Sequence, residues 1–384
     1  MYSPLPYVGH IFWKRRPIQL TFFVTRRCNA KCPFCFYIQG QGESQEHKQR
    51  KVKGQKQEQI VGQKRDVVNG KQSEISLEEI KSLAPSFGRL LWLAFSGGEV
   101  FLREDIVDIS RVFYKHNKPV VLLYSTNGLT PELIRNRTEE ILKACPNSVV
   151  TVKLSLDGLY SDHDALRGVS GSFKKVMKSH QLLGELLDKY PNFELGINTV
   201  FCSANQDKIG EIFDFVKKLD NVRTHTLSMV RGELSDASLK DVDLNKYLEA
   251  IKAIEADMKK QLTQRYRFLG ARLKSAQDIL QRRLIHKTMV EDRRMSPCYA
   301  GRLNLVLTEV GDVYPCEILS QKLGNVRDSD YDIKKILRST QAKSVIRNIS
   351  ESKCFCSHEC YFMTNILFNP RMYPALLKEY LQLR

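Results

Sequence analysis

The chain has 384 residues, of which 42% are hydrophobic and 27% charged, so it can bury an ordinary core and is not disordered as a whole. It carries 60 Lys and Arg against 43 Asp and Glu, a net charge of +17. Its ten cysteines are too few for a small disulfide scaffold and too many to be incidental. The first residues lack the pattern of a signal peptide, and no run reaches the roughly 20 apolar residues of a membrane span. We therefore expect a cytoplasmic protein with reduced cysteines.

Short segments rich in β-branched and aromatic residues alternate with helical patterns along the first part of the chain. The predicted strands are residues 19–25, 91–95, 120–124, 149–156, 193–200 and 222–229. The predicted helices are residues 105–116, 131–143, 172–190 and 208–219. Six such alternations predict an α/β fold with a parallel sheet, which we assign as a partial (β/α)6 barrel of the TIM type. On this fold, chemistry is expected at the C-terminal ends of the strands.

Two stretches interrupt this rhythm. Residues 39–73 are rich in Gln, Lys and Gly and are typical of a basic insertion, whereas residues 244–290 form a long helical pattern that Gly270 divides. After Arg294 the pattern changes to a β-hairpin that turns at Gly311, followed by short helices and an apolar C-terminal helix. We therefore divide the chain into a barrel (1–242), a basic helical connector (243–294) and a small auxiliary domain (295–384).

The first chemical motif is Cys28, Cys32 and Cys35, spaced C-x3-C-x2-C directly after the first predicted strand. Three thiolates on one loop can hold three irons of a 4Fe-4S cluster and leave the fourth iron open to a small molecule. A structural zinc site needs a fourth Cys or His near by, and haem attachment needs a His where Phe36 stands. The motif therefore predicts an iron–sulfur site.

This motif resembles that of radical S-adenosylmethionine (SAM) enzymes, and the similarity extends over the whole chain except the insertion. In that family the open iron chelates the amino and carboxylate groups of SAM, and reductive cleavage yields a 5′-deoxyadenosyl radical that abstracts hydrogen from an unactivated C–H bond. The resemblance also implies a flavodoxin- or ferredoxin-type electron donor. The cofactor would supply the hard chemistry, and the protein would supply position and exclusion of water.

Polar motifs follow the next strands, where such a site needs them. The resemblance implies that Gly97, Gly98 and Glu99 contact the amino group of SAM; the glycines allow close backbone approach, and the alternative is a tight turn with a solvated Glu99. Asp157 is predicted to face the same cavity and to serve the substrate. The other predicted cofactor-binding residues are Phe36, Ser125, Asn127, Ser155, Arg167, Asn198 and Met229. For Asn198 and Met229, packing in the core is an equally good alternative. For Arg167, the alternative is a salt bridge at the surface.

A second group of cysteines lies near the C-terminus: Cys298, Cys316, Cys354, Cys356 and Cys360. With the turn at Gly311, it resembles the start of SPASM or shorter twitch domains, which hold extra 4Fe-4S clusters. A full SPASM domain has seven cysteines for two clusters, so five predict one auxiliary cluster. Cys298, Cys316 and Cys360 are the expected ligands, with Cys356 preferred over Cys354 as the fourth. A cluster whose open iron binds substrate, and a zinc site, are the alternatives.

The positive charge is uneven along the sequence. Residues 257–294 hold eleven Lys and Arg against four Asp and Glu, and the insertion holds eight against four. Neither stretch matches a nucleic-acid-binding fold. A solvated helical face is the simplest explanation; peripheral contact with the inner membrane face through Arg282 and Arg283, or with an acidic substrate, are alternatives.

The expected function is hydrogen abstraction from a small-molecule or lipid substrate, with the auxiliary cluster assisting electron transfer or substrate binding. Maturation of a ribosomally made peptide is the first alternative, and a non-catalytic iron–sulfur sensor is the second. Substrate identity does not follow from the fold and cofactor.

Overall fold

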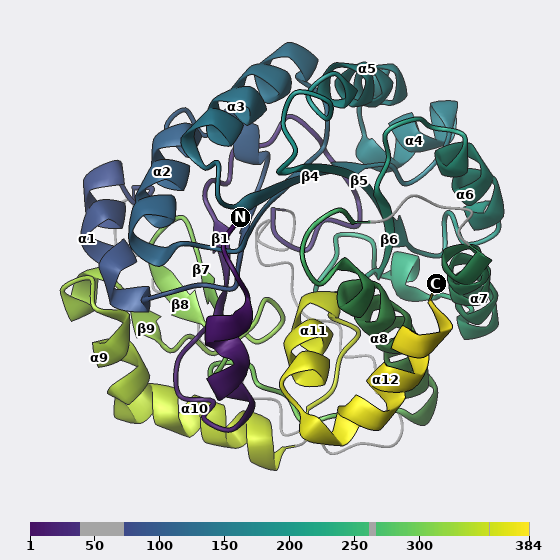
Figure 1. Cartoon of the computed structure of the whole chain (residues 1–384). Helices are drawn as coiled ribbons and strands as arrows, with labels where there is room; N and C mark the ends of the chain where they lie inside the picture. Colours follow the sequence, from purple (N-terminus) through teal and green to yellow (C-terminus); the bar gives the residue numbers. More distant parts are fainter. Residues whose placement is uncertain (39–72, 261–265, 353, 384) are drawn as a thin grey trace.

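The computed structural model describes residues 1–38, 73–260, 266–352 and 354–383. Six parallel strands curve around a common centre, with helices on the outer side (Figure 1). The strands are β1 Gln19–Phe23, β2 Trp92–Ser96, β3 Val121–Thr126, β4 Val149–Ser155, β5 Phe193–Phe201 and β6 Thr224–Met229. The predicted partial (β/α)6 barrel is therefore confirmed.

The outer layer consists of amphipathic helices that cover the apolar side of the sheet. These are α1 Leu77–Phe87, α2 Ile106–Asn117, α3 Pro131–Ala144, α4 Tyr160–Arg167, α5 Ser172–Gly184 and α6 Ile209–Lys217. Side chains such as Leu20 and Phe22 on β1 and Phe95 on β2 are fully buried beneath them. The sequence prediction missed α1, although Ser76 and Glu79 form a capping box at its start. It also missed α4, and it placed the end of α5 beyond Gly184.

The inner side of the sheet is polar toward the C-terminal strand ends. On β4 the alternate residues Thr151, Lys153 and Ser155 face inward, because successive strand side chains point to opposite faces. At the N-terminal strand ends an apolar cluster that includes Val121 and Val149 closes the barrel. The fold thus provides a polar lumen that is open toward the cysteine-bearing loops.

The C-terminal strands continue the barrel sheet. β7 (Asn304–Leu307) pairs in parallel with β1, and β8 (Asp312–Tyr314) and β9 (Gly324–Asn325) follow in antiparallel order, which confirms the predicted hairpin. The sheet order is β6-β5-β4-β3-β2-β1-β7-β8-β9. The remaining helices are α7 Leu244–Lys260, α8 Ala271–Glu291, α9 Ile333–Arg338, α10 Thr340–Glu351, α11 Glu359–Leu367 and α12 Tyr373–Gln382. Short 3-10 helices are η1 Leu5–Ile11, η2 Val100–Leu102, η3 Ala237–Lys240, η4 Arg327–Ser329 and η5 Pro370–Met372.

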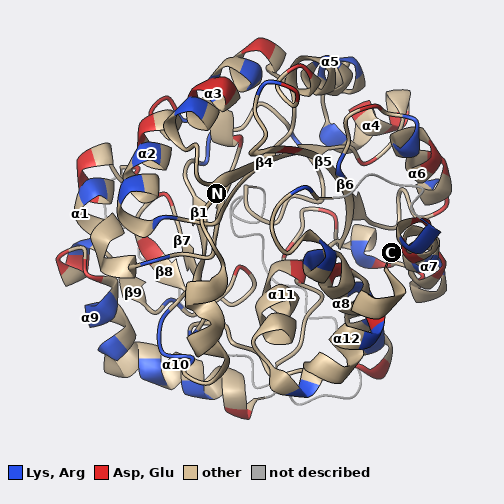
Figure 2. Ribbon diagram, in the orientation of Figure 1, with Lys and Arg blue, Asp and Glu red and all other residues tan. Residues whose placement is uncertain are grey.

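Two arginines of the basic stretch before the C-terminal module are buried or paired with acidic residues. Gly270 directly precedes α8, as predicted. Arg282 is only 7% exposed, and Arg283 pairs with Glu255 and Glu379. Arg282 is therefore not part of a solvated basic face, whereas Arg283 is exposed and ion-paired. Figure 2 shows Lys and Arg interspersed with Asp and Glu over the outer helices.

The basic insertion lies outside the described residues except for Ser73. Among the described helices, none combines the length and the apolar character needed to cross a membrane.

Candidate active site

The cysteines of the C-x3-C-x2-C motif lie in the loop after β1, at the C-terminal end of the barrel. The Ala30 N–H donates to Cys28 Sγ and the Ile38 N–H donates to Cys35 Sγ, both at 3.4 Å. The Arg167 guanidinium donates to Cys32 Sγ at 3.5 Å, and Asn127 Nδ2 donates to Cys28 Sγ at 3.7 Å. Such donors stabilise the thiolate, which is the form that ligates iron. The three side chains therefore fit a 4Fe-4S cluster with three protein ligands.

Two glycines allow β2 to approach the entry of this loop. A Cβ atom at Gly97 would lie 2.5 Å from Thr25 O, and one at Gly98 would lie 2.2 Å from Arg27 O. The Gly98 N–H donates to Thr25 O at 2.8 Å. The backbone leading into the cysteine loop is the group that lies where their Cβ atoms would be, and contact of Gly97 and Gly98 with SAM stays a prediction. A side chain at either position would displace that loop.

Glu99 ties the end of β2 to the end of β3. Its carboxylate is fully buried and accepts hydrogen bonds from the Phe101 N–H at 3.2 Å, the Thr126 hydroxyl at 2.7 Å and the Asn127 N–H at 2.7 Å. Burial raises the pKa of Glu99, and these hydrogen bonds oppose that rise. The solvated alternative is therefore wrong, and Glu99 positions Asn127 beside the cysteine loop. Contact between Glu99 and SAM stays a prediction.

Arg167, the last residue of α4, is held against the cysteine loop. It is 7% exposed, forms an ion pair with Asp157, and lies 5.4 Å from the ring centre of Phe34. Asp157 is fully buried and also accepts the Val200 N–H at 2.7 Å. Both oxygens of Asp157 thus have partners within the chain, and a role of Asp157 toward the substrate stays a prediction. The surface salt bridge is wrong, since Asp157 fixes Arg167 against Cys32 in the interior.

Three other predicted SAM contacts remain at the lumen. Ser155 and Asn198 are register partners on β4 and β5, and Ser125 is exposed near the end of β3. Met229 does not join them: it is 2% exposed and packs in the core between the sheet and the helices. Its neighbour Ser228 faces the lumen instead and donates to Asn198 Oδ1 at 2.9 Å. The alternation of side chains along β6 explains this difference.

Four of the five C-terminal cysteines surround one cavity. Cys298, Cys316, Cys354 and Cys356 line a cavity of about 80 Å³ together with apolar residues. Burial, with a smaller effect of neighbouring cysteine thiols, raises the pKa of Cys316 and of Cys356 to about 12. Cys360 does not line this cavity, and its charged neighbours are Glu317 and Arg231. The structure therefore brings both Cys354 and Cys356 to the cavity of Cys298 and Cys316, whereas Cys360 is not among the residues that line it.

In the described part of the chain, no group of three or more His, Cys, Asp or Glu side chains is arranged to hold a single metal ion. The four cysteines Cys298, Cys316, Cys354 and Cys356 instead line a cavity whose space lies between their thiols. The Leu319 N–H donates to Cys316 Sγ at 3.4 Å, and Arg294 Nη2 donates to Cys354 Sγ at 3.6 Å. Sulfur-directed donors thus occur at this site too, and they fit cluster ligation.

Arg231 joins the two cysteine sites. Its guanidinium pairs with Glu359 at 3.0 Å and with Glu317 at 3.3 Å, the residues adjacent to Cys360 and Cys316. It also lies 5.4 Å from the ring centre of Phe36, which follows Cys35. Burial acts to raise the pKa of Glu317. The neighbouring His358 and Arg231 outweigh this effect and lower the pKa of Glu317 to about 2.

Sequence reasoning missed this charge network. An acidic residue beside each of two cysteines was its only visible sign, and nothing in the sequence indicated that Arg231 would reach them. A second buried contact joins the same parts of the molecule: Glu309, after β7, binds Arg26 at 2.6 Å and the hydroxyl of Tyr37. The two cysteine sites are therefore linked by charges on both sides.

The lumen holds one lysine that the sequence prediction also missed. Lys153 on β4 donates to the Thr226 hydroxyl on β6. Among the described residues, no carboxylate lies within ion-pairing distance of its Nζ. Burial, followed by Lys274, lowers the pKa of Lys153 to about 8. Its position two residues before Ser155, on the same face of the strand, is the sequence signal that could have revealed it.

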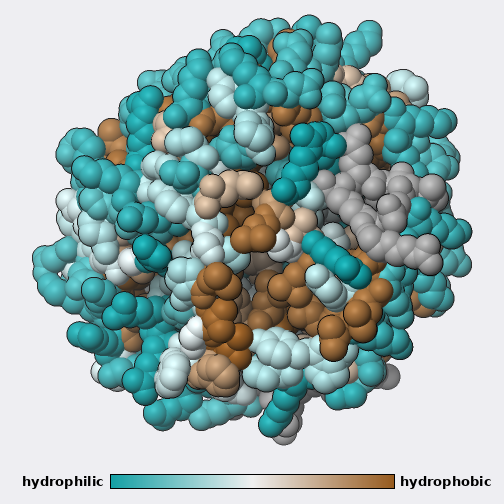
Figure 3. All heavy atoms as spheres, viewed as in Figure 1, coloured by the Kyte–Doolittle hydropathy of each residue, from teal (hydrophilic) through white to brown (hydrophobic). Residues whose placement is uncertain are grey.

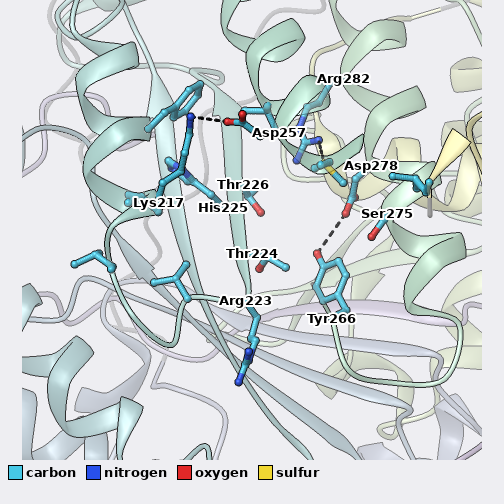
Figure 4. Close-up of a pocket in the computed structure, with 17 residues that line it drawn as sticks. Lys217, Arg223, Thr224, His225, Thr226, Asp257, Tyr266, Ser275, Asp278 and Arg282 are labelled. Atoms are coloured by element: carbon cyan, nitrogen blue, oxygen red, sulfur yellow. Dashed lines mark hydrogen bonds and ion pairs between the residues drawn. The ribbon is translucent and has the colours of Figure 1, made fainter. Parts of the chain in front are cut away.

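A cavity of about 260 Å³ lies between β6 and helices α6, α7 and α8 (Figure 4). Its wall includes Thr226, the partner of Lys153. The labelled charged groups are largely paired: Lys217 binds Asp257 at 2.7 Å, and Asp278 accepts from the Tyr266 hydroxyl at 3.3 Å. This cavity therefore lies at the edge strand of the barrel, between β6 and the helices that cover it.

Comparison with known proteins also divides the chain into a barrel and a C-terminal part that holds the second group of cysteines. The Radical SAM superfamily model matches residues 22–216, just over half of the chain, and the iron-sulfur cluster-binding SPASM model matches residues 298–361. The chain is 26% identical over 295 residues to the AdoMet-dependent heme synthase of Methanosarcina barkeri, covering 74% of this chain and 79% of that protein. It is 24% identical over 363 residues to the subtilosin biosynthesis protein AlbA of Bacillus subtilis, covering 90% of this chain but only 66% of AlbA.

Solved structures show the same fold. Native anSMEcpe with bound AdoMet has a TM-score of 0.56 at 18% identity, covering 95% of this chain and 96% of that chain. Streptococcus suis SuiB bound to S-adenosylmethionine has a TM-score of 0.57 at 16% identity, covering 91% of this chain and 75% of that chain. With the family matches, these findings mean that the chain is an enzyme whose cofactors are 4Fe-4S clusters and SAM, and that it belongs to the radical SAM superfamily and carries a C-terminal SPASM domain.

Proposed function

We propose that this enzyme abstracts hydrogen from an unactivated C–H bond of a substrate whose anionic group binds Lys153 in the barrel lumen. Lys153 carries the proposal, because this half-buried lysine on the inner face of β4 has a hydroxyl partner, Thr226, and no carboxylate within ion-pairing distance among the described residues. Neighbouring hydroxyl groups on Thr151 and Thr226 offer further hydrogen bonds to a carboxylate or phosphate.

Residues around the first cysteine loop would prepare it for the cofactor. Cys28, Cys32 and Cys35 would hold the SAM-binding cluster, which with bound SAM supplies a 5′-deoxyadenosyl radical. Arg167 and Asn127 would stabilise the ligating thiolates through their N–H groups. The candidates to contact SAM from the lumen wall are Ser125, Ser155 and Asn198.

Near the C-terminus, Cys298, Cys316, Cys354 and Cys356 would hold one auxiliary cluster. The cavity that these four thiols share supports this set over one that includes Cys360. Arg231 would position the auxiliary site relative to the lumen, because it contacts the residues that flank the cysteines of both sites. Assistance to electron transfer fits this contact between the two sites.

For the substrate class, we retain a small molecule or lipid with an acidic group as the first candidate. The apolar cluster that closes the barrel at the N-terminal strand ends leaves a lumen of limited depth, which favours a compact reacting group. Peptide maturation is the second candidate. It is supported by the names of AlbA and of the sporulation killing factor maturation protein SkfB, which match over 90% and 86% of this chain.

The first test measures 5′-deoxyadenosine after reduction of the reconstituted enzyme with SAM. Formation of 5′-deoxyadenosine is expected, and its absence would favour the iron–sulfur sensor. Mass spectrometry of cell extracts with and without the gene then identifies the molecule whose mass changes.

With that substrate, Lys153→Met should raise KM at least tenfold, whereas Lys153→Arg should retain most of the binding because it keeps the charge. Lys174→Met, on the outer helix α5, is the matched control and should leave KM unchanged. An unchanged KM in Lys153→Met would refute the role of Lys153. A peptide product would select the second candidate.

A further inference from the structure

The N-terminal end of the barrel carries a large apolar groove. A cavity of about 1050 Å³ lies beside the start of β2 and β3, between η1, the start of α8, and helices α11 and α12. Its rim is formed by exposed apolar side chains: Leu5 is 73% exposed, Leu269 69% and Leu377 56%. Figure 3 shows this hydrophobic surface at the centre of the view. In Figure 1 the same place is occupied by the N-terminal segment in purple and the C-terminal helices in yellow.

Exposed apolar side chains concentrate on the segments that form this groove. Nine of the twelve exposed large hydrophobic side chains in the described residues belong to residues 1–16, 268–274 and 370–383. They include the aromatic side chains of Phe12 and Trp13, which are 71% and 65% exposed. Single exposed apolar residues are ordinary on a soluble protein, whereas a contiguous patch marks an interaction surface.

The charges of the same three segments have one sign. The basic residues are Lys14, Arg15, Arg16, Arg272, Lys274, Arg371 and Lys378. Their only acidic residue is Glu379, which is 2% exposed and pairs with Arg283 and Lys259. Lys274 is also paired, with Asp278 on the same helix. The exposed basic side chains that remain on the three segments make the surface around the apolar groove basic, and its complement is an anionic surface.

This face lies away from the cofactor site. The cysteine loop follows the C-terminal end of β1, whereas the groove borders the opposite ends of the strands at Trp92 and Val121. The apolar cluster containing Val121 and Val149 separates the groove from the polar lumen. A partner seated on the groove would therefore leave the cysteine loop open to an electron donor.

We propose that this face docks on a membrane surface that contains anionic lipid. Leucine, phenylalanine and tryptophan side chains surrounded by lysine and arginine are typical of segments that lie in the lipid interface. The cores of protein interfaces are instead depleted of lysine. The docking face differs from the basic stretch around Arg282 and Arg283, whose charges are buried or paired. The proposal does not depend on the role of Lys153.

The test is co-sedimentation of the full-length protein with vesicles of phosphatidylcholine alone or mixed with phosphatidylglycerol. We expect binding to the anionic vesicles, weakening as salt increases. Leu377→Asp should weaken it by about tenfold or more, the equivalent of the transfer free energy of one leucine side chain. Arg15→Gln with Arg16→Gln should weaken it about fivefold per charge.

Matched controls separate the groove from general effects. Val290 is as exposed as Leu377, at 56%, and lies at the far end of α8, about 30 Å from the groove. Val290→Asp should leave vesicle binding unchanged, as should Lys174→Gln with Lys175→Gln on α5. Circular dichroism and iron content check the fold of each variant.

Three results would overturn the proposal. The first is that wild-type protein fails to bind anionic vesicles. The second is that Leu377→Asp binds as tightly as wild type. The third is that sedimentation velocity shows wild-type dimers that Leu377→Asp converts to monomers, because the groove would then be an interface between two copies of the chain.

Discussion

The two cysteine sites share N–H donors that point at sulfur, and they differ in the groups that surround their thiols. At the first site, N–H donors from the loop itself, from α4 and from the end of β3 converge on the thiols of Cys28, Cys32 and Cys35. At the second site, four thiols share a small cavity with apolar walls, and burial raises the pKa of Cys316 and Cys356 to about 12. Burial raises the pKa of Cys28 and Cys32 at the first site as well, so the difference lies in the apolar residues that line the cavity at the second site.

This difference indicates a division of labour. Hydrogen bonds to cluster sulfur atoms and access to solvent are among the factors that set reduction potentials. A cluster held by the three thiols of the first site would keep one iron open to a ligand, whereas the four thiols around the second cavity could supply a ligand to every iron. Arg231 connects the two, so its charge can influence both.

The largest expected effect comes from removing one ligand of the first site. Cys32→Ala should abolish formation of 5′-deoxyadenosine and reduce the iron content from about eight to about four per chain, because only the auxiliary cluster would remain. Iron analysis and product quantification check both effects. Cys145→Ala, a fully buried cysteine away from both sites, is the control and should retain both properties. Retained SAM cleavage in Cys32→Ala would disprove the assignment of the first site.

Two serine variants test which cysteines ligate the auxiliary cluster at the second site. Cys354→Ser should lose about four irons, because Cys354 lines the shared cavity. Cys360→Ser should retain all of them, because Cys360 faces Glu317 and Arg231 instead. Iron and sulfide analysis distinguishes the variants. The opposite result would restore the sequence-based preference for Cys360 and rule out the cavity as the auxiliary site.

Replacing Arg231 tests the link between the two sites. Arg231→Lys keeps a positive charge but loses the planar fork that meets Glu317 and Glu359. We expect about eight irons to remain, while the midpoint potential of the auxiliary cluster shifts and turnover falls about tenfold. Redox titration followed by electron paramagnetic resonance measures the potential. Lys208→Met, an exposed ion-pair partner of Asp162, is the control. An unmoved potential would limit Arg231 to a structural role.

The smallest effect concerns the attachment of the C-terminal module to α1. Arg327 binds Glu79 at 2.6 Å and, as the largest cause, lowers the pKa of Glu79 to about 2 from 4.5. This stabilisation is present above pH 4.5 and is lost as the pH falls toward 2, because the unfolded carboxyl group protonates first. Glu79→Gln should reduce the unfolding free energy by about 1–2 kcal/mol at pH 7, after allowance for solvent screening.

Unfolding measured at pH 7 and at pH 3 checks this prediction. The difference between wild type and Glu79→Gln should shrink at the lower pH. Glu78→Gln changes an exposed neighbour whose side chain is 79% accessible, and it should show little effect at either pH. An equal loss at both pH values would mean that the ion pair with Arg327 is not the source of the stabilisation.

Local patterns in the sequence predicted the barrel and its cysteine motifs correctly. The alternation of short apolar strands with helices requires a parallel sheet, and the spacing of Cys28, Cys32 and Cys35 requires one loop. Both depend on contacts between near neighbours in the chain. The sequence left lumen and core as equal alternatives for Met229, because a one-residue change of strand face exchanges the two, and it did not indicate that Asp157 would pair with Arg167.

The chemistry of the cysteine sites could thus be predicted from residue types at short spacing. These are three thiols on a loop, five more near the C-terminus, and polar groups after successive strands. Long-range packing alone decided which of these groups meet. It placed Cys354 with Cys298 around a cavity that Cys360 does not line, and it put Arg231 between acidic residues far from it in sequence. It also gathered two chain ends into one apolar, basic face. Sequence spacing carries no information about such contacts, because they depend on how whole elements pack against one another.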